Sequence, residues 1–233
     1  MSSAEGSVER RLLDIRERLE SAANVSGRHP SEITLVGASK RQPLDRMAAA
    51  WQAGLEVFGE NRVQEALDKQ PQLPAAIEWH MIGPLQSNKA RRAAGAFAMI
   101  HSIDRAKIAR RLDRHAGELG LRLTALAEIN LGEEQTKHGF LPADLPEALE
   151  PLLDLEHLMI AGLMAIPPFE SDAEQARHWF RRLRELRDDL FSRSAWSDRP
   201  GYLSMGMSHD FELAIEEGAT HVRVGTALFG PRP

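Results

Sequence analysis

The sequence contains no cysteine, which excludes disulfide bonds and thiolate metal sites and is typical of a protein of the reducing cytoplasm. It has no run of the roughly 18 apolar residues that a membrane-spanning helix needs, and its amino terminus is polar, unlike a signal peptide. The net charge of -5 offers no electrostatic attraction to nucleic acid or to an anionic membrane. We therefore expect a cytoplasmic, monomeric protein that binds neither nucleic acid nor membranes.

Sequence motifs for metal and nucleotide chemistry are missing as well. The chain has no HExxH grouping, no Walker A sequence and no GxGxxG after a strand-like run. We therefore expect no metal site.

Lysine is scarce in a chain rich in arginine, and its five lysines are Lys40, Lys69, Lys89, Lys107 and Lys137. Four of them fall in polar or helix-like contexts, but Lys40 directly follows an apolar, strand-like run at 33–39. A lysine amine, unlike a guanidinium, can lose its proton and attack a carbonyl. Lys40 therefore suits a Schiff base with an aldehyde, although its position alone fits a surface lysine equally well.

The hydrophobic pattern predicts one (β/α)₈ TIM-type barrel with an extra N-terminal helix. Apolar residues spaced by four and three predict an amphipathic helix at about 6–24. Short apolar runs then alternate with helical stripes, and the predicted strands are 33–39, 57–59, 79–83, 99–103, 125–130, 158–166, 202–207 and 221–225. Such alternation is typical of a parallel sheet, and eight units favour a closed barrel over about 33–230. We predict a single domain over 1–233, with a doubly wound open sheet as the alternative.

The carboxyl ends of barrel strands open onto one face, where barrel enzymes place their chemistry. On this face we expect Ser204-x-Gly206-x-Ser208, which leads into a helix, and Gly225-Thr226 after the last strand. Hydroxyls and backbone N–H groups at a helix start favour an anion, and barrels often bind phosphate between these two loops. The alternative is that Ser208 only caps its helix and that Asp210 complements the helix dipole.

Arg223 lies within the last predicted strand. It alternates with Val222 and Val224, so it points into the barrel if the valines pack outward. A buried arginine needs a partner, either an anion or ring-nitrogen acceptor of a ligand, or a carboxylate such as Glu128. His80 and His101 also lie in strands, where histidines are usually hydrogen-bonded core residues.

Several segments together carry a family resemblance, and they are Lys40, 59–61, 79–89, 162–167, 204–208 and 224–230. With these segments in order from about 33 to 230, the chain resembles the pyridoxal phosphate homeostasis proteins, which share the barrel of the alanine racemase N-terminal domain. The WHxIGxLQxNK pattern at 79–89 is especially specific to that family.

The resemblance implies the cofactor pyridoxal 5′-phosphate (PLP), held by Lys40 as a Schiff base. It further implies that Arg223 faces the pyridine nitrogen and that Asn61 and His80 lie near the ring. The loop residues that it implies for the cofactor are Ser204, Met207, Ser208, Gly225 and Thr226, of which all but Met207 would bind the phosphate.

The resemblance also implies a protein without catalytic residues. Arginine cannot accept a proton from the ring nitrogen, which makes the ring a weak electron sink. An alanine racemase also needs a tyrosine opposite its lysine and a C-terminal β domain, whereas here the only tyrosine, Tyr202, begins a strand at the wrong end. We therefore expect a non-enzymatic PLP-binding protein of vitamin B6 homeostasis that exchanges PLP with apo-enzymes. The alternatives are a PLP-dependent enzyme, such as an amino-acid racemase for an unrecognised amine, and an interaction protein with a vestigial cofactor.

Overall fold

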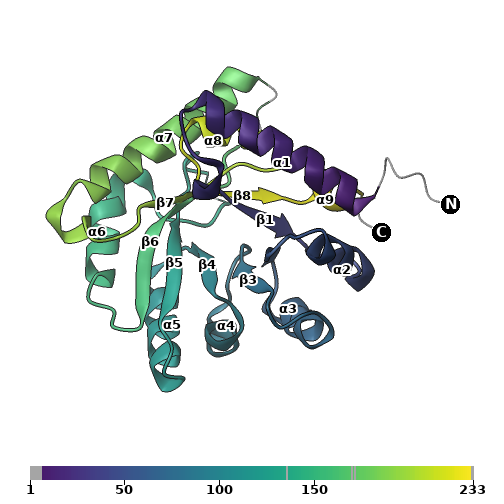
Figure 1. Ribbon diagram of the computed structural model, residues 1–233. Coiled ribbons are helices and arrows are strands. Elements are labelled where there is room, and N and C mark those ends of the chain that lie inside the picture. The colour runs from purple at the N-terminus through teal and green to yellow at the C-terminus, as the bar shows by residue number, and fades with distance from the viewer. Residues whose placement is uncertain (1–6, 135, 169, 171, 232–233) are drawn as a thin grey trace.

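The computed structural model describes residues 7–134, 136–168, 170 and 172–231. Its eight strands form a closed barrel in chain order, and every neighbouring pair is parallel (Figure 1). The strands are β1 (Thr34–Ala38), β2 (Val57–Glu60), β3 (Glu78–Met81), β4 (Met99–Ile103), β5 (Leu123–Glu128), β6 (Leu158–Met164), β7 (Tyr202–Ser204) and β8 (His221–Val224). The predicted (β/α)₈ barrel is confirmed, and the open-sheet alternative is wrong because β8 pairs with β1.

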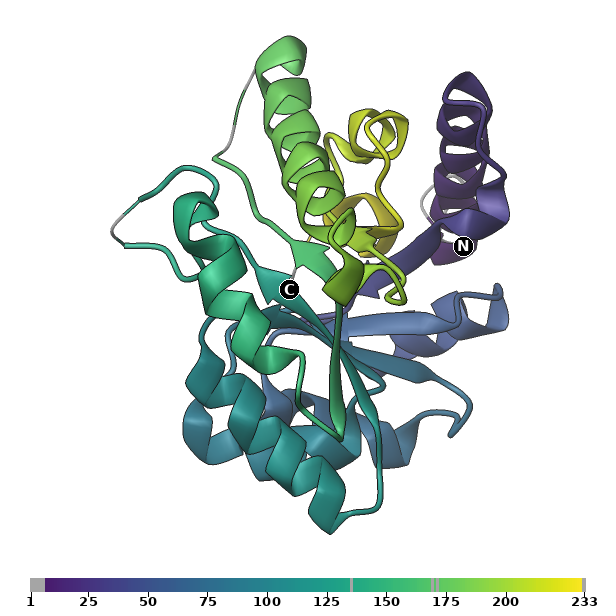
Figure 2. The same ribbon diagram turned by 90° about the vertical axis from the view of Figure 1, so that its left-hand side faces the viewer.

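Helices surround the strands on the outside of the barrel (Figure 2). They are α1 (Val8–Val25), α2 (Leu44–Gln52), α3 (Val63–Lys69), α4 (Ala90–Ala96), α5 (Ala106–Glu118), α6 (Leu145–Leu149), α7 (Ala173–Phe191), α8 (Phe211–Glu216) and α9 (Thr226–Phe229). None of the helices within the described residues is both long and apolar enough to cross a membrane.

The extra N-terminal helix is α1. Ser7 caps it by accepting a hydrogen bond from the Arg10 N–H, and its buried stripe includes Leu12, Ile15 and Leu19. This stripe packs against α8, α9 and α2, so α1 covers the junction where β8 meets β1. Its observed start at Val8 lies close to the predicted start at about residue 6, which is outside the described residues.

Two kinds of core follow from the alternation of side chains along each strand. Outward side chains such as Val222 and Val224 join a large apolar layer between strands and helices. Inside the barrel only a small apolar cluster forms, from Met99, Leu126, Ala161 and Met164, with Tyr202 packed against it. Much of the rest of the interior is polar, and its buried members include His80, His101, Ser204, His221 and Arg223. The barrel therefore encloses a column of hydrogen-bonding groups.

Candidate functional site

Lys40 lies two residues beyond the end of β1, at the carboxyl-terminal mouth of the barrel. It lines a cavity of about 230 Å³ together with Asn61, Arg62 and Glu65. We call this space the Lys40 cavity. The structure thus brings together Lys40 and Asn61, two of the residues that the sequence singles out.

Lys69, a buried lysine that the sequence analysis did not single out, holds the turn that carries Lys40 by hydrogen bonds. The Lys69 ammonium donates to the Ser39 carbonyl (2.9 Å), to Glu60 Oε1 (2.7 Å) and to Glu65 Oε1 (2.8 Å). Three acceptors converging on one point suit the three donors of an ammonium and not the flat fork of an arginine. Lys69 therefore ties the end of β1 to β2 and α3, a role in which arginine would not serve.

The same cluster holds Arg41, whose backbone has φ = 57°. This left-handed conformation is costly for a residue with a side chain, and the Arg41 N–H is held by Glu65 Oε1. Burial raises the pKa of Glu65, but the hydrogen bonds from Lys69 and Arg41 outweigh that effect and lower it overall. Burial raises the pKa of Glu60 despite its bond to Lys69. The turn that presents Lys40 is thus fixed by charged hydrogen bonds.

The loops after β7 and β8 meet at Ser208. Its hydroxyl oxygen accepts hydrogen bonds from the backbone N–H groups of Gly225 (3.2 Å) and Ala227 (3.3 Å). The N-cap residue of α8 is Asp210, whose carboxylate accepts from the Met207 N–H and makes no hydrogen bond to the first turn of the helix. The alternative in which Ser208 only caps α8 is therefore wrong.

Gly206 shapes the first of these loops. Its φ of +88° favours glycine, and an added Cβ would lie 2.5 Å from the Ala214 Cβ and 3.0 Å from the Phe211 Cα. Its carbonyl accepts a hydrogen bond from the Arg223 N–H, which joins the loop to β8. The two loops are therefore held together as one unit, in which backbone donors converge on an oxygen acceptor.

Arg223 points into the barrel, as the alternation along β8 predicts, and only 4% of it is exposed. Its guanidinium donates to Ser204 Oγ (2.5 Å) and to the Ala165 carbonyl (2.9 Å). Burial lowers the pKa of Arg223 to about 10, with Glu128 and Asp210 opposing the shift, so the group stays charged at neutral pH. Within the described residues Arg223 forms no ion pair with Glu128, so the predicted alternative of a salt bridge to Glu128 is wrong.

Ser204 and His80 lie deeper in the barrel than the loops. The Ser204 hydroxyl is fully buried between Arg223 and a ring nitrogen of His101 and, within the described residues, has no hydrogen-bond partner in common with Ser208. His80 is 1% exposed and both of its ring nitrogens are bonded, one to His101 and one to Glu78. The structure does not bring these two side chains to the Lys40 cavity or to the Ser208 loop.

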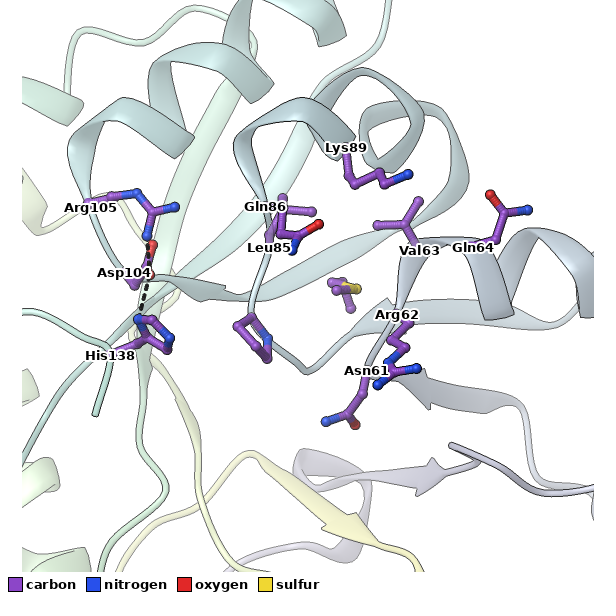
Figure 3. Close-up of a pocket in the computed structure, with 12 residues that line it drawn as sticks. Asn61, Arg62, Val63, Gln64, Leu85, Gln86, Lys89, Asp104, Arg105 and His138 are labelled. Atoms are coloured by element: carbon purple, nitrogen blue, oxygen red, sulfur yellow. Dashed lines mark hydrogen bonds and ion pairs between the residues drawn. The ribbon is translucent and has the colours of Figure 1, made fainter. Parts of the chain in front are cut away.

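A second, larger cavity of about 700 Å³ adjoins the Lys40 cavity, with which it shares Asn61 and Arg62. Figure 3 shows Asp104 and His138 on one side of this cavity and Arg62 on the other. Asp104 pairs with His138 at 3.5 Å, and burial raises the pKa of its carboxyl group. The larger cavity gives the Lys40 turn an open approach from the side of β2, β3 and β4.

These groups fit an anionic aldehyde that carries a ring nitrogen. Lys40 offers an amine, the loops at Ser208 and Gly225 offer converging N–H donors, and Arg223 offers a buried positive charge. Since β1 pairs with β8 through Val36 and Arg223, all of these groups lie at adjoining strand ends. The arrangement can hold such a molecule by one covalent and several polar contacts.

Comparison with known proteins identifies close relatives along almost the whole chain. Residues 14–233 match the family described as alanine racemase, N-terminal domain. The chain is 44% identical over 223 residues to a protein of Aquifex aeolicus named pyridoxal phosphate homeostasis protein, with 95% of this chain and 97% of the relative covered. It is 45% identical over 224 residues to a Pseudomonas aeruginosa protein of the same name, with 95% and 94% covered.

Solved structures of similar proteins have the same barrel fold. PipY of Synechococcus elongatus, with PLP bound, superposes with a TM-score of 0.81 at 41% identity and covers 93% of this chain and 100% of its own. An alanine racemase of Clostridium difficile superposes with a TM-score of 0.69 at 15% identity, covering 95% of this chain and 60% of its own. The racemase similarity concerns the fold alone, because its identity is low.

Proposed function

Since the chain belongs to the alanine racemase N-terminal domain family and, within it, to the pyridoxal phosphate homeostasis proteins, we propose that it binds PLP and takes part in intracellular vitamin B6 homeostasis. The PLP that is bound in the PipY relative supports this proposal. The observation that carries it is the placement of Lys40, the Ser208 and Gly225 loops and Arg223 at neighbouring strand ends.

Each group has a definite part in the proposed site. PLP supplies an aldehyde that forms a Schiff base with a lysine amine, here that of Lys40. The Ser208 and Thr226 hydroxyls would bind the phosphate. The N–H groups of Gly225 and Ala227, which donate to Ser208 Oγ in this structure, would turn to the phosphate with them, since converging backbone donors suit an anion. Met207 lies in the same phosphate loop.

The ring would lie between these two anchors. Arg223 would donate toward the pyridine nitrogen, and Asn61, which lines the Lys40 cavity, would lie beside the ring. Ser204 would affect the cofactor only through Arg223, to which it is hydrogen-bonded, and His80 lies farther along the same interior hydrogen bonds.

The proposed protein holds and releases PLP and has no demanding catalysis. Arg223 stays charged and cannot take a proton from the ring nitrogen, so carbanions on the cofactor gain little stabilisation. Tyr202, the only tyrosine, begins β7 and packs against the ring of His221 (5.1 Å between centroids), away from Lys40. The tyrosine that would act as the second base of racemisation, opposite Lys40, is therefore missing from this sequence.

We also propose a compartment, an oligomeric state and recipients for the protein. We place it in the cytoplasm as a monomer, because a cysteine-free chain suits a reducing compartment. Apo-enzymes that need PLP would be its recipients, since an exchangeable bond on Lys40 and an open approach through the larger cavity favour transfer.

A spectrum and a peptide map test the proposal. The purified protein should be yellow, and borohydride should fix the mass of PLP on the peptide that contains Lys40. Lys40→Ala should remove the absorbance band while the barrel still folds, and Lys89→Ala, a change in the neighbouring cavity, should keep it. Attachment at Lys89 or Lys137 would contradict the proposal.

Turnover assays separate a binding protein from an enzyme. We expect no measurable interconversion of L- and D-alanine, and we expect PLP to pass from the loaded protein to an apo-enzyme. Turnover of any amino acid at about 1 per second or faster would contradict the non-enzymatic part of the proposal.

A further inference from the structure

We propose that Glu78, at the amino-terminal mouth of the barrel, positions Arg223 at the opposite mouth through a hydrogen-bonded relay formed by His80, His101 and Ser204. The inference rests on the proposed function, because it concerns how the arginine that would face the cofactor is held. Glu78, His80 and His101 come from β3 and β4, whereas Ser204 and Arg223 come from β7 and β8. The relay therefore crosses the inside of the barrel.

Four consecutive contacts make up the relay. Arg223 Nη1 lies 2.5 Å from Ser204 Oγ, and His101 Nδ1 lies 2.8 Å from the same oxygen. His101 Nε2 lies 3.0 Å from His80 Nδ1, and His80 Nε2 lies 2.8 Å from Glu78 Oε1. Each distance is that of a hydrogen bond, so no gap interrupts the column.

The chemistry of the donors sets the direction of the relay. Arg223 can only donate, so Ser204 Oγ accepts from it, and we assign the hydroxyl hydrogen of Ser204 to His101 Nδ1. Burial, together with the nearby His80, His221 and Arg223, lowers the pKa of His101 well below its usual value, so its ring is neutral. A neutral His101 that accepts at Nδ1 must donate from Nε2 to His80 Nδ1.

The same reasoning completes the relay at Glu78. His80 accepts at Nδ1, and its Nε2–H then donates to the Glu78 carboxylate, which accepts only. Both histidines therefore carry their proton on Nε2, and every member of the relay is satisfied. The burial of His80, His101 and Ser204, each at most 1% exposed, makes an unsatisfied member costly.

An added proton would reverse the relay. If His80 carried two protons, it would donate both to Glu78 and to His101 Nε2, and His101 would then donate from Nδ1 to Ser204. Ser204 Oγ would receive hydrogens from both Arg223 and His101, and its own hydrogen would have to leave the relay. The orientation of the Ser204 hydroxyl beneath Arg223 thus depends on charge at the far mouth.

Other ionisable groups surround this column and share its electrostatics. The His221 ring on β8 lies 6.0 Å from that of His80 and 5.5 Å from that of His101, and Tyr202 on β7 packs on His221. At the other end Glu128 and Asp210 act on the charge of Arg223.

The Glu78 end of the relay is accessible. Glu78, His80 and His221 line a cavity of about 610 Å³ at the amino-terminal mouth, beside α1, and 52% of the Glu78 side chain is exposed. Glu56 lines the same cavity, and within the described part of the chain its side chain forms no hydrogen bond or ion pair with the relay residues. Only its backbone carbonyl accepts from the Glu78 N–H, and Glu56→Ala keeps that bond, which makes Glu56 a matched control. The end of the relay can therefore be changed without entering the barrel core.

Nitrogen NMR of the histidine rings tests the relay in the unaltered protein before cofactor is added. In the assigned direction, His80 and His101 each carry a proton on Nε2 and accept a hydrogen bond at Nδ1. A proton on Nδ1 of either ring, or two protons on either, would overturn the assigned direction. This measurement needs no variant and no bound PLP.

Variants test whether Glu78 positions Arg223. Glu78→Ala should change the tautomer signals of His80 and His101 and weaken PLP binding by about threefold to tenfold, as expected for one lost hydrogen bond acting through others. It should also shift the pH profile of the cofactor's visible absorbance. Glu78→Gln, which keeps an acceptor for His80, should restore most of the affinity, and Glu56→Ala should leave all readouts unchanged.

The two proposals fail in different ways. If PLP is attached to Lys40 but Glu78→Ala and Glu56→Ala behave alike, the relay is overturned and the proposed function stands. If PLP does not attach to Lys40, the proposed function fails, and the NMR arm still decides whether the relay exists.

Discussion

The two mouths of the barrel are built from the same eight strands but carry opposite chemistry. The carboxyl-terminal mouth presents Lys40 and the backbone donors that meet at Ser208, with Arg223 beneath them. The amino-terminal mouth presents the carboxylate of Glu78 and the ring of His221. Donors and positive charge at one end suit an anionic cofactor, whereas the other end accepts hydrogen bonds. Hydrogen-bond donors therefore lie at one end of the polar column inside the barrel, and acceptors lie at the other.

The largest expected effect concerns the support of the carboxyl-terminal mouth. Replacing Lys69 by Met would leave the buried Glu60 carboxylate with the Ser39 hydroxyl but without a cation, and we expect about 3 kcal/mol or more of lost unfolding free energy. Urea denaturation measures this loss. Lys107→Met, at an exposed position on α5, should stay within about 0.5 kcal/mol of the wild type. A mild effect of Lys69→Met would show that the Lys40 turn does not depend on this cluster.

The second largest effect is a loss of folding stability at low pH, caused by His221 at the amino-terminal mouth. Burial lowers the pKa of His221 from 6.5 to about 3, so the unfolded chain binds more protons than the folded one between these values. The contribution of a neutral His221 is therefore complete above about pH 6.5 and is lost as the pH falls, by about 2 kcal/mol at about pH 5.

Denaturation at several pH values measures this loss. His221→Gln should flatten the dependence of stability on pH between about 6.5 and 4, because the titrating group is gone. His178→Gln, at an exposed position on α7, should leave the slope as it is. An unchanged slope in His221→Gln would mean that other groups cause the acid sensitivity.

The smallest effect concerns the phosphate loops. Ser208→Ala should weaken PLP binding by about 1 to 2 kcal/mol, since one hydroxyl contact to a charged group is lost. Thr226→Ala should weaken PLP binding by a similar amount. Ser192→Ala changes an exposed hydroxyl at the end of α7, outside the phosphate loops, and should leave PLP binding unchanged. Equilibrium titration followed by absorbance measures the affinities. Equal affinity for PLP and for unphosphorylated pyridoxal would remove phosphate from these loops.

Much of the fold could be predicted from local patterns. The four-and-three spacing that predicts α1, and the alternation of Val222, Arg223 and Val224 in β8, both reappear in the structure. The strand that ends before Lys40 is also found where it was expected. Such patterns are readable because helices and strands repeat over short distances, and a buried face must be apolar at each repeat.

Side-chain partners inside the site could not be predicted in the same way. Ser204 and Ser208 belong to one short motif, yet one hydroxyl points into the barrel and the other joins the β8 loop. Lys69 and Glu65 stand four residues apart on a helix, which is a readable spacing, but Glu60 belongs to β2. No local pattern shows that these three side chains share one buried cluster.

Local sequence patterns predict the alternation of strands and helices, the placement of Lys40 after a strand and, with Val222 and Val224 packed outward, the inward direction of Arg223. The tertiary structure alone decided which groups meet in the interior, as when His101 and Ser204, 103 residues apart, form a hydrogen bond. The physical reason is closure of the barrel. Joining β8 to β1 forces inward side chains from all of the strands into one narrow space. Their hydrogen bonds must be satisfied there, and which partner each one finds depends on register across the barrel and not on distance along the chain.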